Sequence, residues 1–416
     1  MKFSEIPASL YEQARQAEQE LAGVFAHIDE VASKNTQRVL EAFQEERVSD
    51  TLFAGTAGYG YDDRGRDTLD RIWARVFGAE AALVRRSFVN GTHAITASLF
   101  AAVRPGDTLL SVTGAPYDTL REAIGIQGDA FGSLRFYGVD YAQVELAADG
   151  GADLPAIAEA VRRIRPAAVT IQRSRGYGQR RALSSEEIGE ICRCVKEISP
   201  ETVCVCDNCY GEFVGTTEPT MLGADLIAGS LIKNPGGGLA PTGGYVAGRA
   251  DLVERAAFRL TSPGIGGECG SEEAGYRTLY QGLFLAPHTV AQALKTAAFC
   301  AAMLQRFGLE SSPGPFEERN DIIQMICFGD GDKLRRFCRG IQHGAPVDSF
   351  VTPEPWKMPG YDCEVIMAAG AFVQGASIEL SCDGPMKPPY TGYLQGGLTY
   401  ESGRLGILLA LAEMMD

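Results

Sequence analysis

Short apolar runs alternate with helical segments along residues 69–260 of the chain. The apolar runs are rich in β-branched residues and comprise AALVRR, TLLSV, AAVTIQ, TVCVC, DLIAGS and GYVAG. Amphipathic segments such as SSEEIGEICRCVKEI lie between several of them. This alternation predicts βαβ units and a mostly parallel sheet that is covered by helices on both faces. We therefore expect an α/β fold whose functional groups lie at the carboxyl ends of the strands.

The first 48 residues have helical periodicity, and we expect them to form an N-terminal helical arm. Leu21, Phe25 and Ile28 recur on one helical face, and the turn-like residues 33–35 predict a break between two helices. A polar loop that is rich in glycine and tyrosine follows at residues 55–67. Loops of this composition commonly carry binding residues.

The Gly-rich run PGIGGECG at residues 263–270 ends the alternating pattern. A long helix is predicted over 287–308, and the remaining residues are typical of a smaller α+β unit with a last helix, GRLGILLALAEMM. The strand candidates of this unit are residues 322–328, 363–369 and 376–381.

The length of 416 residues exceeds what a single hydrophobic core usually organises. We therefore expect a helical arm at residues 1–48, a large domain at 49–285, and a small C-terminal domain with its linking helix at 286–416.

The amino-acid composition argues against two classes of partner, nucleic acids and membranes. The net charge is −15, and no run of Lys or Arg forms a basic stripe, which argues against a nucleic-acid partner. No signal-peptide core and no apolar stretch of about 18 residues occurs, so we expect a cytoplasmic protein with no membrane partner. The eleven cysteines, an odd number, are typical of reduced thiols in such a compartment.

Two charged residues stand at the ends of two predicted strands. The run VCVCD ends in Asp207, and Lys233 ends the run SLIK 26 residues later. A carboxylate beside a pyridine nitrogen keeps that nitrogen protonated, and a lysine can form an imine with an aldehyde. Upstream, Gly91 and Thr92 open a helix directly after a strand, where exposed backbone N–H groups can bind a phosphate. These are the residue types that a pyridoxal phosphate enzyme requires at its cofactor.

This pattern resembles the fold-type I pyridoxal phosphate enzymes, whose fold is of the aspartate aminotransferase type. The resemblance covers about residues 50–416 and is closest to methionine γ-lyase-like proteins, which include cystathionine β-lyase relatives and aluminium-resistance proteins. Its more specific pieces are QRSRGY, SLIKNPGGG, IELSCDGP and KPPY. It implies that Lys233 carries pyridoxal phosphate as a Schiff base and that Asp207 meets the ring nitrogen.

The resemblance also implies further cofactor residues in the same chain. Gly91, Thr92 and Ser230 would hold the phosphate, and Tyr117 would stack on the pyridine ring. Arg173 and Ser174 lie where the family places a residue over the 3-oxygen of the cofactor.

A second group of residues would act across a subunit interface. Tyr61 and Arg64 resemble the tyrosine and arginine that reach the phosphate of a neighbouring subunit, which implies a homodimer or homotetramer with shared active sites. The substrate would be a small amino acid.

One departure from the family concerns the substrate carboxylate. Better-known carbon-sulfur lyases have an arginine in an Arg-Leu-Ser context on a late strand, and here Glu379 stands at that position in the run IELS. Lys387 and Arg404 are the candidate substitutes.

The activity implied by the resemblance is β- or γ-elimination from a substrate such as cystathionine, cysteine or methionine. An aminotransferase or another amino-acid transforming enzyme would share the proton abstraction by Lys233 and is an alternative. A different alternative is a metal-binding or redox protein that uses the cysteines between Cys192 and Cys209. Helix positions 192 and 194 do not share a face, and buried cysteine is common, so we expect no metal ligands there.

Overall fold

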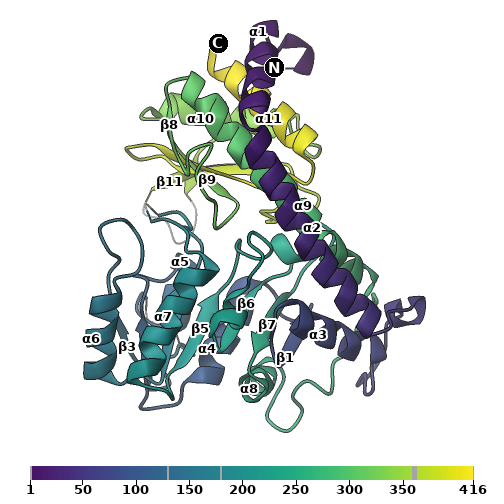
Figure 1. Cartoon of the computed structure of the whole chain (residues 1–416), viewed down its shortest axis with the longest axis vertical. Coiled ribbons are helices and arrows are strands. Elements are labelled where there is room, and N and C mark those ends of the chain that lie inside the picture. Colours follow the sequence, from purple (N-terminus) through teal and green to yellow (C-terminus); the bar gives the residue numbers. More distant parts are fainter. Residues whose placement is uncertain (1, 129–130, 179, 358–362, 416) are drawn as a thin grey trace. The chain divides into compact units, whose positions relative to one another are not determined.

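The computed structural model describes residues 2–128, 131–178, 180–357 and 363–415 (Figure 1). The chain divides into two compact units. The large unit comprises residues 35–231 and 239–284, and the small unit comprises residues 1–34, 232–238 and 285–416. The domain boundaries expected at residues 48 and 285 stay predictions.

The described part of the large unit contains a seven-stranded sheet with the order β1-β7-β6-β5-β4-β2-β3. Its strands are parallel except β7, which runs antiparallel to both neighbours. The strands are β1 (Ala81–Arg85), β2 (Thr108–Ser111), β3 (Asp140–Gln143), β4 (Ala168–Gln172), β5 (Val203–Asp207), β6 (Leu226–Ser230) and β7 (Gly244–Gly248). The prediction of a mostly parallel sheet is confirmed. The strand β3 was not predicted, because its sequence, DYAQ, is largely polar.

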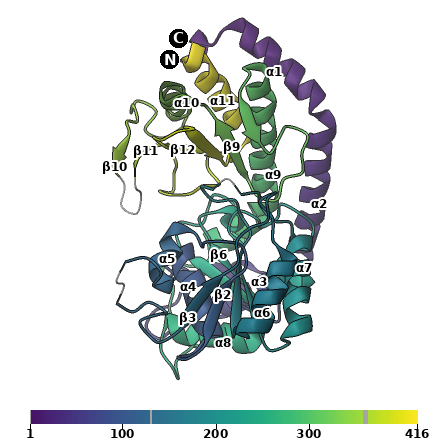
Figure 2. The same ribbon diagram turned by 90° about the vertical axis from the view of Figure 1, so that its left-hand side faces the viewer.

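Helices cover both faces of this sheet. They are α3 (Arg64–Val76), α4 (Gly91–Ala102), α5 (Asp118–Ile124), α6 (Leu154–Ile164), α7 (Ser185–Ile198) and α8 (Ala250–Leu260). In Figure 2, α4 and α5 lie on one side of the sheet, and α6 and α7 lie on the other. Alanines and valines of α4, α8 and the central strands form one buried cluster, so the face toward α4 belongs to the core.

The small unit is built on a second sheet. This six-stranded sheet has the order β10-β11-β12-β13-β9-β8, and its paired strands are antiparallel in the described residues. Its strands are β8 (Glu310–Ser312), β9 (Ile323–Cys327), β10 (Trp356–Lys357), β11 (Glu364–Ala369), β12 (Ser381–Pro385) and β13 (Thr391–Gln395). The strands expected near 322–328 and 363–369 are present, but the strand expected at 376–381 is wrong, because those residues form a turn that leads into β12.

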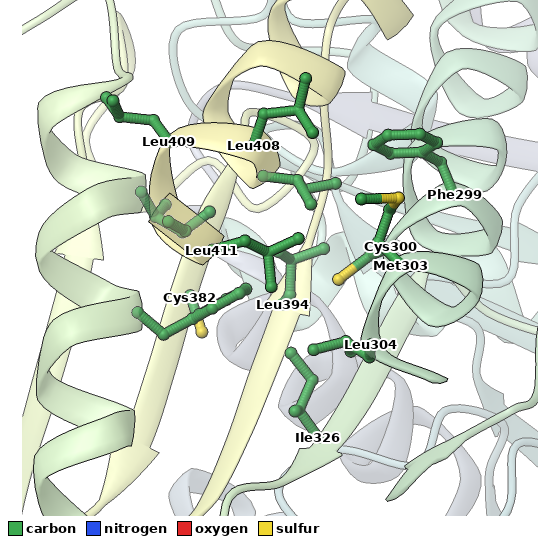
Figure 3. Close-up of a cluster of buried hydrophobic side chains, with 14 of the residues drawn as sticks. Phe299, Cys300, Met303, Leu304, Ile326, Cys382, Leu394, Leu408, Leu409 and Leu411 are labelled. Carbon is green, nitrogen blue, oxygen red and sulfur yellow. The ribbon is translucent and has the colours of Figure 1, made fainter. Parts of the chain in front are cut away.

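Apolar side chains of four helices and this sheet form the core of the small unit. The helices are α1 (Ala8–Glu20), the C-terminal part of α9 (Arg277–Arg306), α10 (Gly331–His343) and α11 (Tyr400–Met415). Figure 3 shows Phe299 and Met303 of α9 beside Leu408 and Leu411 of α11, above the strand residue Leu394. The last predicted helix is therefore present, with residues 406–412 buried.

Two helix boundaries differ from the sequence predictions. The helix α2 (Ala22–Glu45) continues through residues 33–35, where a break was expected. Asn35 donates hydrogen bonds from its side chain to the carbonyl oxygens of Phe213 and Gly215, both at 3.0 Å. These tertiary bonds outweigh the turn preference of asparagine. The helix α9 begins ten residues before the expected start and contains Pro287 in its interior.

Two further properties of the chain bear on its function. No helix in the residues that the structure describes is long and apolar enough to cross a membrane. The eleven cysteines all lie among the described residues, and no disulfide joins them.

Candidate active site

The first turn of α4 lies against the end of β6. Asn90 caps α4, and its side-chain Oδ1 accepts a hydrogen bond from the backbone N–H of His93 at 2.9 Å. A Cβ atom at Gly91 would lie only 2.9 Å from Cβ of Ser230, so the close approach requires glycine. Ser230 is itself buried. Gly91 and Ser230, which are far apart in the sequence, are therefore neighbours at a helix N-terminus that can bind an anion.

Asp207 shares a sheet face with Ser230. Asp207 ends β5 and pairs in register with Ala228, two residues before Ser230. Because side chains alternate along a strand, Asp207, Ala228 and Ser230 point to the same face. That face is the one toward α4, since Val205 and Ala228 both belong to the core cluster that includes α4. Asp207 is 7% exposed, and its Oδ1 accepts a hydrogen bond from the backbone N–H of Cys209 at 3.1 Å.

Tyr117 stands next to the same helix N-terminus. It is the N-cap residue of α5 and packs, partly buried, against the core cluster of the α4 face. Two residues later, the Thr119 hydroxyl oxygen lies 2.8 Å from the hydroxyl oxygen of Thr92 in the first turn of α4. This hydrogen bond joins the first turns of α4 and α5. Thr119 was not predicted, because a threonine at the start of a helix is common and has no distinctive spacing.

Gly176 lies between Tyr117 and the end of β4. A Cβ atom at Gly176 would be 3.4 Å from the ring of Tyr117 and 3.2 Å from Nε2 of Gln172. Gln172 pairs in register with Asp207, so both side chains point to the same face. The large unit thus gathers the N-terminus of α4, Tyr117, Gln172 and Asp207 at the carboxyl ends of β4, β5 and β6. This is the edge at which parallel sheets bind ligands.

Lys233 follows this edge along the chain. It lies three residues after Ser230, the last residue of β6, and is the N-cap of the short 3₁₀ helix Asn234–Gly236. It is partly buried. The division of the chain assigns Lys233 to the small unit, within the segment 232–238.

Arg173 is held by polar contacts within the large unit. Its guanidinium is buried, donates from Nη1 to Oδ1 of Asn208 at 2.7 Å, and pairs with Glu218 at 3.3 Å. It follows Gln172 in the chain, so we expect it to point away from the face of Asp207. Ser174 is also buried, and its carbonyl oxygen accepts a hydrogen bond from Nε2 of Gln172 at 3.1 Å. Contacts of Arg173 and Ser174 with a cofactor stay predictions.

Tyr61 lies on a loop that the large unit holds in place, and Arg64 begins the helix α3 that follows this loop. Tyr61 is 61% exposed and stacks on Tyr59 with a ring-centroid distance of 5.6 Å. Arg64, the first residue of α3, is also exposed. Beneath them the buried guanidinium of Arg66 donates to the carbonyl oxygen of Gly60 at 2.7 Å. The loop and the first turn of α3 therefore present two polar side chains on the surface of the unit, while the backbone of the loop is fixed.

Glu379, which stands where the family has its arginine, closes a turn in the small unit. It is 3% exposed. Its two carboxylate oxygens accept hydrogen bonds from the backbone N–H groups of Phe372 at 2.8 Å and Val373 at 2.9 Å. A carboxylate that meets two backbone donors in this way has a structural function.

The two candidate substitutes for that arginine differ in their surroundings. Nε of Arg404 donates to Oε1 of Glu18 at 2.7 Å, and Nη2 donates to Oε2 at 3.3 Å. Arg404 thus already binds a carboxylate of its own chain. Lys387 is exposed in the loop after β12. Neither role is tested by these surroundings, and both stay predictions.

The cysteines of the large unit do not assemble a metal site. Within the described ranges, no group of three or more His, Cys, Asp or Glu side chains could hold a metal ion. Burial raises the pKa of the Cys206 thiol well above its ordinary value. Hydrogen bonding to the Cys192 thiol, followed by burial, does the same for Cys204. Such thiols stay protonated in the metal-free protein.

Comparison with known proteins identifies the family. The model of the family described as methionine gamma-lyase matches residues 10–415. The chain belongs to the methionine gamma-lyase family. The protein YnbB of Bacillus subtilis strain 168 is 49% identical to this chain over 408 residues, which are 98% of this chain and 97% of YnbB.

Solved structures agree with this assignment. A carbon-sulfur lyase involved in aluminum resistance from Clostridium novyi NT is 52% identical, with a TM-score of 0.94, and the match covers 98% of this chain and 96% of that one. The pyridoxal-5'-phosphate dependent protein YhfS from Escherichia coli is 19% identical, with a TM-score of 0.63 over 92% of this chain and 95% of its own. At that identity the likeness concerns the fold alone. The predicted fold, that of fold-type I pyridoxal phosphate enzymes, is confirmed.

Proposed function

We propose that this member of the methionine gamma-lyase family is a pyridoxal phosphate-dependent carbon-sulfur lyase that acts on a sulfur-containing amino acid. The observation that carries the proposal is the group of Asp207, Tyr117, Ser230 and the first turn of α4 at one edge of the parallel sheet. The 52% identity to the carbon-sulfur lyase of Clostridium novyi supports the reaction class.

The residues of this edge fit the cofactor. The space beside Ser230, which a side chain at position 91 would fill, lies at the N-terminus of a twelve-residue helix and suits a phosphate. Thr92 and Ser230 add hydroxyl donors, and Asp207 supplies a buried carboxylate for the ring nitrogen. The ring of Tyr117 offers an apolar face on which a pyridine ring can stack.

Each of these residues has a defined task in an elimination. Pyridoxal phosphate, when bound, supplies an electron sink for the negative charge that develops at Cα of the substrate. Asp207 holds a proton on the pyridine nitrogen, and this positive charge strengthens the sink. The first turn of α4 and Ser230 bind the phosphate and so fix the position of the ring.

Lys233 moves the protons of the reaction. With the substrate bound, its amine would take the proton from Cα as a general base. Tyr117 or Lys233 would then deliver a proton to the sulfur that leaves from Cβ. A sulfur at Cγ could leave only after a second proton, from Cβ, has also been removed, and Lys233 would again be the base. Hydrolysis of the resulting enamine yields a ketoacid and ammonia.

The active form is a homodimer or a dimer of dimers. Tyr61 lies exposed on a fixed loop and Arg64 at the start of the helix that follows, and they would reach the phosphate of a second copy of the chain. Lys387 and Arg404 are the candidates for binding the substrate carboxylate.

The test is the formation of ketoacid from cystathionine, cysteine or methionine by the purified protein loaded with pyridoxal phosphate. We expect ketoacid and ammonia in equal amounts with no added amino acceptor, and no product from Lys233→Ala. A turnover that requires a second ketoacid would instead identify an aminotransferase. Absence of any reaction with all three substrates would contradict the proposal.

A further inference from the structure

Thr119 connects two helices that begin at the candidate phosphate site. It lies in the first turn of α5, whose N-cap is Tyr117, and it is exposed. Its hydroxyl oxygen lies 2.8 Å from the hydroxyl oxygen of Thr92. Thr92 follows Gly91 in the first turn of α4. One hydrogen bond therefore joins the turn that carries the candidate ring-stacking residue to the turn that carries the candidate phosphate site.

Thr92 is in a position to add a donor to a phosphate at the N-terminus of α4. It is only partly buried, and it follows Gly91, whose backbone approaches the side chain of Ser230. The backbone N–H groups of a first helical turn have no acceptor within the helix, which makes this end of a helix suitable for an anion. A hydroxyl in the same turn can donate one further hydrogen bond to that anion.

A bound phosphate would fix the direction of the hydrogen bond between the two threonines. A hydroxyl group has one O–H donor and two acceptor lone pairs. The ionised oxygens of a phosphate only accept hydrogen bonds, so Thr92 would have to use its single O–H to bind the phosphate. Its lone pairs would then be all that it offers to Thr119, and Thr119 would be the donor. Hydrogen bonds in such a chain polarise and strengthen one another.

We propose that Thr119 is a positioning residue for the phosphate of the cofactor. Its hydroxyl donates to Oγ1 of Thr92 and so directs the O–H of Thr92 toward the phosphate. Thr119 acts through Thr92 and not by a contact of its own with the phosphate. This inference rests on the proposed function, because it requires pyridoxal phosphate at the N-terminus of α4.

The test compares two ligands that differ only in the phosphate. Pyridoxal has the ring and the aldehyde of pyridoxal phosphate but a hydroxyl group in place of the phosphate. Thr119→Val replaces the hydroxyl with a methyl group of similar volume, and Thr119→Ser keeps the hydroxyl. Dissociation constants of both ligands are measured by absorption titration of the apo forms of wild type and variants, with no need for catalytic activity.

We expect Thr119→Val to weaken the binding of pyridoxal phosphate about threefold to tenfold, as for the loss of one hydrogen bond, and to leave the affinity for pyridoxal unchanged within about twofold. Thr119→Ser should bind both ligands as the wild type does. In a protein that already carries Thr92→Val, the further change Thr119→Val should have no effect on either affinity, because the two hydroxyl groups act as a pair.

Thr51→Val is the matched control. The hydroxyl oxygens of Thr51 and Ser49 lie 2.7 Å apart, so this exposed pair has the same kind of hydrogen bond in the same unit of the chain. Its removal should change the affinity for neither ligand.

Three results overturn the assignment of Thr119 and leave the proposed function intact. They are an equal loss of affinity for pyridoxal phosphate and pyridoxal in Thr119→Val, an unchanged affinity for pyridoxal phosphate, and a loss that persists in the Thr92→Val background. A wild-type protein that binds neither ligand overturns the proposed function, and the assignment of Thr119 with it.

Discussion

Asp207 is the residue on which the chemistry of the site depends most directly. It is 7% exposed, and its partners include the backbone N–H of Cys209. A buried carboxylate is costly unless donors or a positive charge surround it. A protonated ring nitrogen would supply that charge, and the carboxylate would in turn raise the pKa of the nitrogen.

Asp207→Asn should therefore impair the reaction while the protein stays folded. Loss of the charge would lower the pKa of the ring nitrogen by roughly one to three units, so we expect kcat to fall by roughly tenfold to a thousandfold. Steady-state ketoacid release and the melting temperature measure the two effects.

Asp225→Asn is the matched control for that variant. Asp225 is also buried, accepts from the backbone N–H of Cys204 at 2.7 Å, and pairs with Lys196 at 2.8 Å. We expect a lower melting temperature and an unchanged kcat per folded molecule. Equal loss of kcat in both variants would mean that Asp207 acts only through stability.

The residues that sequence could predict are those with an unusual chemical type at a fixed spacing. Asp207 and Lys233 each end an apolar run, and this order is rare outside a site. Gln172 and Thr119 were missed because an amide at the end of a strand and a hydroxyl at the start of a helix are ordinary. The register between β4 and β5 places Gln172 at the site, and the contact with Thr92 places Thr119 there. Neither can be read from the sequence.

At the scale of elements, the N-terminus of α4 determines where an anion can bind. Gly91→Ala would place a methyl group 2.9 Å from Cβ of Ser230, inside the space proposed for the phosphate. We expect the affinity for pyridoxal phosphate to fall by roughly tenfold or more, because overpacking commonly costs about 1–3 kcal/mol. The dissociation constant of the cofactor is the measurement.

Gly23→Ala serves as the control for Gly91→Ala. Gly23 lies in α2, where an added Cβ would have no neighbour within 4 Å. Alanine should stabilise the helix slightly and leave the cofactor affinity unchanged. An affinity loss of the same size in both variants would contradict the assignment of the phosphate site to α4.

The N-cap of α3 should make the large unit sensitive to acid. Burial raises the pKa of Asp63, but hydrogen bonds from the side chains of Thr56 and Tyr276 and from the backbone N–H of Arg66 lower it more, so the net pKa lies below the ordinary value. A depressed pKa adds stability that is present above about pH 4 and is lost as the pH falls through the folded-state pKa.

Asp63→Asn should thus lower the free energy of unfolding at neutral pH. In acid the difference between variant and wild type should become smaller. Denaturant unfolding of wild type and variant at a series of pH values measures the difference in the free energy of unfolding. We expect a constant difference above about pH 5 and a smaller one below about pH 4. A difference that stays constant down to about pH 3 would show that Asp63 does not titrate in this way.

Most elements followed from periodicity, and the exceptions have physical reasons. The buried strands β4, β5 and β6 are continuous apolar runs, which the sequence displays directly. The continuity of α2 was missed because Asn35 finds acceptors more than 170 residues away, at Phe213 and Gly215. Local sequence cannot reveal such partners.

At the scale of the whole molecule, Tyr61 and Arg64 imply sites that two copies of the chain complete together. Neither Lys233→Ala nor Arg64→Ala should be active alone. When the two are mixed and allowed to exchange subunits, half of the dimers are mixed, and each has one intact site. We expect recovery of about a quarter of the wild-type activity. Mixtures that stay inactive, although exchange is shown by mass labelling, would place Arg64 outside the shared site.

The central claim is that Lys233 carries pyridoxal phosphate, and the visible absorption spectrum tests it most directly. Wild type and Lys233→Ala are compared after incubation with the cofactor, before and after borohydride. We predict a band near roughly 420 nm in the wild type, of the kind expected for a lysine-bound pyridoxal cofactor, and its loss or displacement in the variant. Borohydride should bleach the wild-type band and attach the cofactor covalently at Lys233. A wild type that stays colourless with the cofactor, or a variant with the same band and the same covalent attachment, would contradict the account.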